Sequence, residues 1–381
     1  MTSKIIVNNI EADTGISTIT FNNDISSNTV RGNIISDGTS TFDVISGVST
    51  IGVTTAHVTS INNLSYPTAG ALSNRNRIIN GSMVVAQWGT SSTANGYVAL
   101  DRWYVNQSGG STTFSQETFT VGEERSGLQN YAKLAVSTSS DYTNISQRIE
   151  NVKSIPSGSV TVSFDAKGTA PTGNLTVSLV QNFGSGGSSD VDITPQTVTL
   201  TSSWQRFNLT FTVPSITGKT VGSDNFLQIA IGQYSNTSTT AWELNITGVQ
   251  LEVGSKSTPF EHRSYGDELA RCQRYYQKVI NSAGGTARTF VMGAYVVTRA
   301  FGGYPLSTPM RSDPDVTFSG LKLERLNLSA SYTVTDANTY QTMIGSNAQS
   351  MEFNVASGLT GNEAYYVAFD SGGYLAFDSE L

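Results

Sequence analysis

The chain has 381 residues, of which only 13% are charged, against about 25% in ordinary soluble domains. Its 22 basic and 29 acidic side chains give a net charge of −7, which excludes a nucleic-acid-binding protein, because such a protein needs a basic surface to face phosphates. The single cysteine, Cys272, excludes an intramolecular disulfide and a cysteine-based zinc site.

The first residues contain no long apolar region and no small-residue cleavage site, so no secretory signal peptide is expected. No stretch approaches about 18 consecutive apolar residues, so we expect no membrane insertion. If the protein ends up outside a cell, it is therefore not expected to leave by ordinary secretion, and release by lysis fits this combination.

Residues 1–72 are predicted to form a short N-terminal β shaft or anchor. A motif of Gly, any residue, Ser-Thr and an apolar residue occurs at residues 15–19, 38–42 and 47–51. The segment has too few large apolar residues to bury a core alone, so we expect three chains to pack together as a homotrimer. A flexible polar linker is the alternative, but frequent β-branched residues favour strands.

Residues 73–262 are predicted to form a jelly-roll β-sandwich. Short alternating segments, each bounded by Gly, Ser, Asn or Pro, follow one another without an intervening helix, which is typical of sandwiches. The expected strands cover residues 97–105, 129–137, 144–149, 159–166, 175–181, 204–213, 226–233 and 241–251.

Residues 263–285 are predicted to contain one connecting helix, over 264–281. Ser264 or Asp267 can cap its start, and Gly284 lies beyond its end. One apolar seam is expected to lie along it, either on the sandwich or on symmetry mates. The seam consists of Leu269, Cys272, Tyr276 and Val279.

Residues 286–381 are predicted to form a small C-terminal β domain at the tip of the protein. Its alternating segments are residues 289–298, 315–318, 329–334, 350–355, 365–369 and 374–377. The domain is rich in tyrosine, a residue common at interfaces, although core or trimer packing explains the same pattern. The tyrosines in question are Tyr304, Tyr365, Tyr366 and Tyr374.

Several separated motifs occur in an order that resembles the C-terminal half of many phage tail-fibre and tail-tip proteins, over roughly residues 75–381. They lie at residues 76–83, 101–105, 248–254, 258–264, 268–276, 309–314 and 374–381. Residues 75–262 are also similar to carbohydrate-binding jelly rolls appended to glycoside hydrolases, through residues 147–149, 160–168, 203–207 and 211–214. Residues 4–10 look like the start of structural proteins of marine phages.

The resemblance implies a virion protein, assembled in the cytoplasm of a bacterial host, that recognises the host surface. Its implied partners are other tail or capsid proteins, bound through the N-terminal region, and a host-surface glycan or protein. A purely structural collar, capsid or tail-assembly fibre is the alternative within this class, and a glycan hydrolase or depolymerase is the alternative from another class.

The sequence gives little support to an enzyme. His57 and His262 are the two histidines, and neither lies near a Gly-x-Ser-x-Gly motif that would place a nucleophile. A depolymerase needs two carboxylates about 5–10 Å apart, and no pair among the 29 acidic residues stands out. The tandem Glu123 and Glu124 reads as a solvated surface.

A glycan site requires an exposed aromatic face together with amides or carboxylates that bond sugar hydroxyls. Trp103, Trp204 and Trp242 lie in alternating segments and are expected in the core. Trp88 precedes a polar run and is the better exposed candidate. The candidate glycan-binding residues are Trp88, Tyr97, Gln181, Asn182, Gln228, Gln233 and Tyr234.

No cofactor or metal site is predicted. The acidic loop at residues 188–192, with Asp190 and Asp192, offers oxygen ligands for Ca²⁺, an ion that the related sugar-binding jelly rolls often hold. A solvated turn is the simpler interpretation of this loop.

Overall fold

The structure is a computed structural model that describes residues 74–381 except 126, 139–141, 171–173, 234–240 and 342–347. It also describes a short antiparallel pair, β1 (Ser60–Ile61) and β2 (Leu64–Ser65). The chain divides into units of residues 1–57 and 58–381, and all described residues belong to the second. Apart from β1 and β2, the expected shaft lies outside the described residues.

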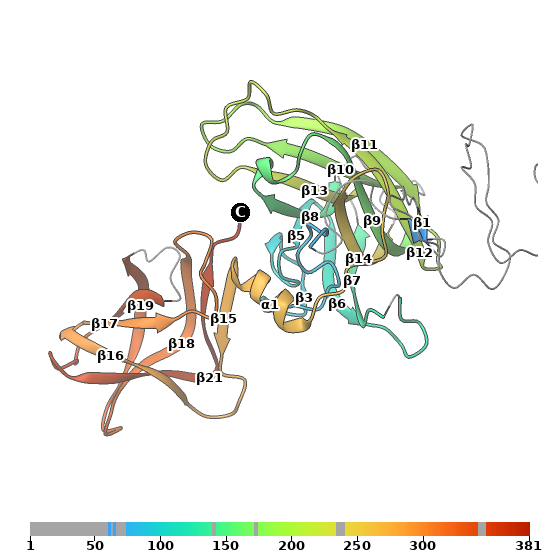
Figure 1. Cartoon of the computed structure of the whole chain (residues 1–381). Coiled ribbons are helices and arrows are strands. Elements are labelled where there is room, and N and C mark those ends of the chain that lie inside the picture. Colours follow the sequence, from blue (N-terminus) through green and yellow to red (C-terminus); the bar gives the residue numbers. More distant parts are fainter. Residues whose placement is uncertain are drawn as a thin grey trace, which may run out of the picture. The chain divides into compact units, whose positions relative to one another are not determined.

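A jelly-roll sandwich of two six-stranded antiparallel sheets forms the first part of this unit (Figure 1), which confirms the expected fold. Neighbouring strands in each sheet are mostly distant in sequence, as the crossing connections of a jelly roll require. The first sheet has the order β11 (Val191–Thr199), β10 (Asn174–Asn182), β13 (Phe226–Gln233), β8 (Tyr142–Glu150), β5 (Tyr104–Ser108) and β4 (Gly96–Tyr97). The second has the order β12 (Gln205–Val213), β9 (Gly158–Thr169), β14 (Trp242–Val253), β7 (Asn130–Thr138), β6 (Ser111–Thr118) and β3 (Ser91–Ser92).

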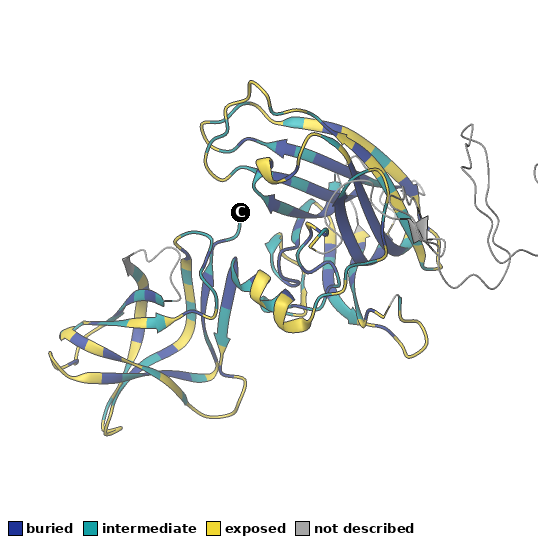
Figure 2. Ribbon diagram, in the orientation of Figure 1, coloured by how far each residue is buried: buried dark blue, intermediate teal, exposed yellow. Residues whose placement is uncertain are grey.

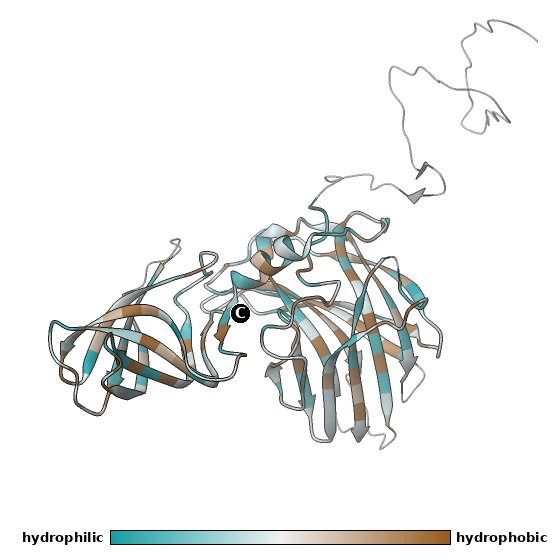
Figure 3. Cartoon of the chain, turned by 90° about the horizontal axis from the view of Figure 1, so that it is seen from below, coloured by the Kyte–Doolittle hydropathy of each residue, from teal (hydrophilic) through white to brown (hydrophobic). Residues whose placement is uncertain are grey.

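The sandwich core forms because alternate residues of each strand point to the same face. The strands in Figure 3 accordingly alternate between apolar and polar positions, and Figure 2 shows the buried residues on the facing strands. Burial of apolar surface at about 25 cal/mol per Å² makes this core the main source of stability. Core residues include Val160, Val162 and Phe164 of β9, Leu227, Ile229 and Ile231 of β13, and Leu244 and Ile246 of β14.

Three segments of the sandwich, besides the two-residue strand β3, differ from the sequence prediction. Strands β6 and β11 were not expected, because Ser, Thr and Gln dilute the alternation of β6 and Pro195 interrupts β11. The predicted strand 97–105 is instead β4, a turn and β5. In that turn Arg102 has φ 69° and the Trp103 N–H donates to the Leu100 carbonyl.

The connecting helix is shorter than predicted. Helix α1 covers Tyr265–Gln273, and Ser264 caps it by accepting a hydrogen bond from the Asp267 N–H, as expected. Residues Tyr276–Ile280 form strand β15 rather than a continued helix, so the predicted four-residue seam is wrong. The segment contains an aromatic and two β-branched side chains, and pairing with a neighbouring strand outweighs its weak helix propensity. No helix in the described part is long and apolar enough to cross a membrane.

The C-terminal domain is a closed antiparallel barrel, which confirms the expected small β domain. Strand β21 pairs with β16 on one side and β18 on the other, and this second pairing closes the barrel. Strand β17 was not expected, because Gly302 and Gly303 break its pattern, and the two last predicted strands are one. The strand order is β15, β21 (Ala364–Asp378), β16 (Ala287–Val296), β17 (Arg299–Pro305), β20 (Ala348–Val355), β19 (Ser331–Gln341) and β18 (Asp315–Arg325).

The sandwich core gives a direct stability prediction. Phe164 is fully buried among apolar neighbours, so Phe164→Ala should lower the free energy of unfolding by about 3–5 kcal/mol through lost burial and a residual cavity. Val121 is 93% exposed, and Val121→Ala should change it by less than about 0.5 kcal/mol. Urea denaturation measures both, and equal effects would contradict this assignment of the core.

Candidate functional site

Two of the predicted glycan-binding residues point into the sandwich. Gln181 shares the orientation of Leu179 on β10, and Gln233 shares that of Ile231 on β13. Both are buried, and their amides donate to the carbonyls of Pro214 and Asn174. The structure therefore does not offer Gln181 or Gln233 to a ligand, because strand alternation places them inward.

Two of the three predicted aromatic candidates, Trp88 and Tyr97, pack against the protein itself. The ring of Trp88 stacks on Tyr276 of β15, with centroids 3.7 Å apart and planes 13° from parallel. Tyr97 contacts Tyr104 edge to face, and its hydroxyl donates to the Leu381 carbonyl at 3.4 Å. Burial raises the pKa of Tyr97 and of Tyr276. One face of Trp88 is thus covered, a tertiary contact that its sequence neighbourhood did not indicate.

Asn182 and Gln228 do lie on the outer face of the first sheet. Asn182 shares its orientation with Val180, which is paired with Gln228 across β10 and β13. The Asn182 amide donates to both carboxylate oxygens of Asp190, at 3.0 and 3.1 Å. The seventh candidate, Tyr234, lies outside the described residues.

The loop suggested for Ca²⁺ shows no grouping of ligands. Asp190 is bonded by Asn182, and Asp192 is exposed on β11. The residues that the structure describes contain no group of three or more His, Cys, Asp or Glu side chains that could hold a metal ion. The preferred interpretation of this loop as a solvated turn, and the calcium site as its alternative, both stay predictions.

The tryptophans expected in the core fall into two groups. Trp103 and Trp242 are buried, as predicted. Trp204 is half-buried and packs on the outer face of the second sheet, against Phe119 and Tyr131 at ring-centroid distances of 5.1 and 5.4 Å. The inward residues of strand β12 are Phe211 and Val213, so the same alternation extended back to position 204 places Trp204 on the outer face.

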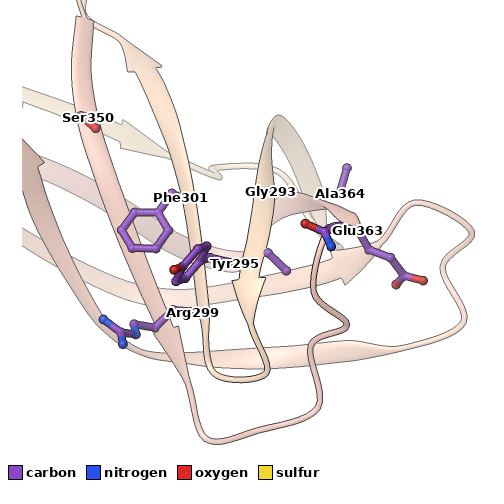
Figure 4. A pocket seen from close by; sticks show the side chains of 9 residues that line it. Gly293, Tyr295, Arg299, Phe301, Ser350, Glu363 and Ala364 are labelled. Atoms are coloured by element: carbon purple, nitrogen blue, oxygen red, sulfur yellow. The ribbon is translucent and has the colours of Figure 1, made fainter.

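The barrel carries an open groove of about 820 Å³ on its outer surface (Figure 4). The hairpin of β16 and β17 supplies Tyr295, Arg299 and Phe301, and the start of β21 supplies the opposite wall. The remaining lining residues are Gly293, Ala294, Ser350, Asn362, Glu363 and Ala364.

The floor of this groove exists because position 293 has no side chain. Gly293 is paired with Phe301 on one side and Ala364 on the other, in ordinary strand geometry. A Cβ added there would meet only the Phe301 carbonyl oxygen, at 4.0 Å. A larger residue would therefore fill the groove without disturbing the backbone.

Tyr295 presents an aromatic face beside this floor. Its side chain is 71% exposed, and its ring meets Phe301 edge to face at 5.9 Å and 81°. Figure 4 shows Arg299 on the same side of the groove and Glu363 on the other, with the carboxylate turned away from Tyr295. This arrangement combines an aromatic platform with nearby hydrogen-bonding groups, which suits a polar ring-shaped ligand.

Both charged groups of the groove already have ion-pair partners. Arg299 lies 3.7 Å from the Glu352 carboxylate, and Glu363 lies 3.4 Å from Arg325. Because each charge has a partner of opposite sign, the groove is close to neutral. Surface ion pairs of this kind are weak, so Arg299 and Glu363 can also form hydrogen bonds to a ligand.

The sequence analysis missed Tyr295 and Gly293. It named four other tyrosines, of which Tyr365 is buried and Tyr304, Tyr366 and Tyr374 are half-buried. A usable signal was present, because Tyr295 and Gly293 share the outward orientation of Val291 on β16. An aromatic residue on the outward side of a strand is more informative than tyrosine content.

No protein-family model and no curated protein matches the chain. Among solved structures, it is similar to a CBM4 protein at 22% identity, over 45% of this chain and 97% of that one, with a TM-score of 0.30. It is similar to the family 11 carbohydrate-binding module of a cellulosomal cellulase of Clostridium thermocellum at 14% identity, over 46% and 98% of the chains, with a TM-score of 0.29.

A third similar structure is the enzymatically active domain of tailspike protein 4 of bacteriophage CBA120, at 14% identity and a TM-score of 0.32. The match covers 47% of this chain and 21% of that one. At such identities and TM-scores the likeness carries no functional information, so function has to be argued from the side chains.

A half-buried carboxylate at the barrel end next to the sandwich makes stability depend on pH. Burial, followed by the charge of Asp315, raises the pKa of Asp378 to about 6, whereas Arg102 and Arg311 oppose the shift. The folded protein therefore binds this proton more tightly than the unfolded chain, and the contribution of Asp378 to stability is lost as pH rises from about 4 through about 6.

Asp378→Asn should remove this one contribution to the pH dependence of stability while keeping the hydrogen bond from the Glu380 N–H. The variant should gain stability relative to the wild type between about pH 4 and about pH 7, as urea denaturation measures. Asp192→Asn removes an exposed charge and serves as the control. If the free energies of unfolding of Asp378→Asn and the wild type differ by the same amount at about pH 4 and at about pH 7, the prediction is contradicted.

Proposed function

We propose that this chain is a non-enzymatic component of a bacteriophage fibre or spike that binds a host-surface glycan through the barrel groove. The observation that carries the proposal is the exposed ring of Tyr295 beside the open floor at Gly293. A sugar ring stacks its C–H face on an aromatic ring, and the flat floor leaves space for it.

Polar groups around the floor suit sugar hydroxyls. The Asn362 amide donates and accepts hydrogen bonds, Arg299 donates, and the Ser350 hydroxyl does both. Because these groups lie on three different segments, a ligand that bonds all of them must lie across the groove. An open groove also admits one stretch of a long polysaccharide, which a closed cavity would not.

Catalysis is not part of the proposal, because glycoside hydrolysis uses two carboxylates that face each other across the bond. Among the described residues that line the groove, Glu363 is the only carboxylate, and it is directed toward Arg325. Release of reducing ends from host polysaccharide would contradict a non-enzymatic role.

A structural role in virion assembly is the second candidate. Exposed apolar side chains at two hairpin tips of the barrel favour it, because a protein partner would cover them. Val297 is 59% exposed between β16 and β17, and Leu326 and Leu328 are 48% and 57% exposed between β18 and β19. Loss of virion assembly in variants of these tips, with host binding intact, would favour this candidate.

Substitutions in the groove test the glycan proposal. Tyr295→Ala removes the stacking face, and Gly293→Val fills the floor, so each should weaken binding to host polysaccharide by about tenfold or more. Tyr265→Ala, which removes a tyrosine 57% exposed on helix α1, is the matched control and should bind as the wild type does. Surface plasmon resonance on immobilised polysaccharide measures all three, and wild-type binding by both groove variants would contradict the proposal.

Assembly through residues 1–72 is the second part of the proposal. Three weak glycan contacts on one particle gain strongly from avidity. Light scattering should give about three times 40.6 kDa for the full chain and a smaller mass for a protein that starts at Ala71. A strict monomer at micromolar concentration would contradict the trimer.

A further inference from the structure

A second pocket, of about 300 Å³, lies between the sandwich and helix α1 and is rich in arginine. Arg77, Arg102, Arg148 and Arg271 line it, and Glu150 is its one carboxylate among the described lining residues. This grouping stands out because the chain as a whole has a net charge of −7.

The one carboxylate of the pocket is already satisfied. Arg274 donates to both Glu150 oxygens, at 3.1 and 3.0 Å, and the Tyr275 hydroxyl donates at 3.0 Å. Since Arg274 does not line the pocket and offsets the Glu150 charge, the lining arginines leave an excess of positive charge there.

Two of these arginines are held in fixed positions and keep an unpaired N–H. Arg102 is 1% exposed, forms an ion pair with Glu380 and donates to the Arg148 carbonyl at 2.6 Å. Arg148 donates to the Leu381 carbonyl and lies over the Phe226 ring at 4.8 Å. The Nε atom of each is buried without a hydrogen-bond partner, although such groups in proteins are usually bonded.

The other two arginines are exposed at the pocket. Arg271 donates to the Asn74 side-chain oxygen at 2.9 Å, a neutral acceptor that leaves its charge uncompensated. The Arg77 side chain has no hydrogen-bond or ion-pair partner among the described residues. Arg77 can thus turn toward a ligand, and Arg271 offers an uncompensated charge in a fixed position.

We propose that this pocket binds an oxyanion, that is a sulfate, phosphate or carboxylate group, either free or carried on an acidic saccharide. Guanidinium groups bond such oxygens in a planar, often bidentate geometry, and a cleft lined by one sign of charge concentrates counter-ions. A volume of about 300 Å³ admits the charged group and a few attached atoms rather than a polymer chain. The site is separate from the barrel groove and does not depend on the function proposed for it.

Calorimetric titration of the full chain with sodium sulfate at low ionic strength tests the site. The double variant Arg77→Gln/Arg271→Gln should bind sulfate about tenfold more weakly or not at all, since it removes two exposed donors. The control Lys219→Gln/Lys256→Gln removes two positive charges elsewhere on the sandwich and should keep the wild-type affinity. Absence of sulfate binding by the wild type, or equal binding by all three proteins, would overturn the proposal.

Competition then identifies the source of the oxyanion. Displacement of sulfate by a sulfated or uronic-acid oligosaccharide, but not by a neutral one of the same length, supports a saccharide-borne group, whereas displacement by inorganic phosphate alone supports a free ion. Equal displacement by the neutral oligosaccharide would contradict an oxyanion site. Tyr295→Ala should retain sulfate binding, so failure of the barrel groove and failure of this pocket are told apart.

Discussion

The alternation of side chains along each strand is the constraint on which the rest of this structure depends. A residue on one side of a strand enters a close-packed core, and its neighbour stays on the surface, whatever its chemical type. Gln181 and Asn182 are adjacent amides with the same capacity to bond a sugar, yet one is buried and the other lies on the outer face. Orientation, rather than residue type, therefore decides which polar groups a ligand can reach.

The same constraint explains how the barrel forms a groove. Inward residues such as Met292 and Ala294 fill the barrel, so a hollow on the outside can only come from outward positions that lack bulk. Gly293 supplies that missing bulk between Phe301 and Ala364, and Tyr295 stands next to it on the same face. The fold does not require glycine at position 293, because its backbone is ordinary strand and a Cβ would be tolerated. The glycine therefore shapes the outer surface of the barrel rather than its core.

Sequence reasoning located the two β domains because apolar and polar residues alternate in many of their strands. An error in the predicted bounds of one strand therefore does not change the predicted fold. The segment after helix α1 shows its limit: Tyr276–Ile280 is too short for periodicity to separate helix from strand, and pairing with β21 decides. Trp88 shows a second limit. Its partner Tyr276 lies 188 positions away in the chain, and no local pattern around either residue indicates that the two rings stack. Candidate sites were harder to predict than the fold for this reason, since a site depends on a few contacts between distant residues.

The barrel groove and the arginine pocket differ in whether the partner of each arginine carries a charge. In the barrel, Arg299 and Arg325 face the carboxylates of Glu352 and Glu363, so charge is neutralised in place and the groove is suited to neutral hydroxyl groups. In the arginine pocket, Arg271 is held by the amide oxygen of Asn74, and a neutral acceptor fixes the geometry of a guanidinium without cancelling its charge. An acidic chain that holds arginines in this way keeps a local positive potential against its own net charge, which an anion would relieve and a neutral sugar would not.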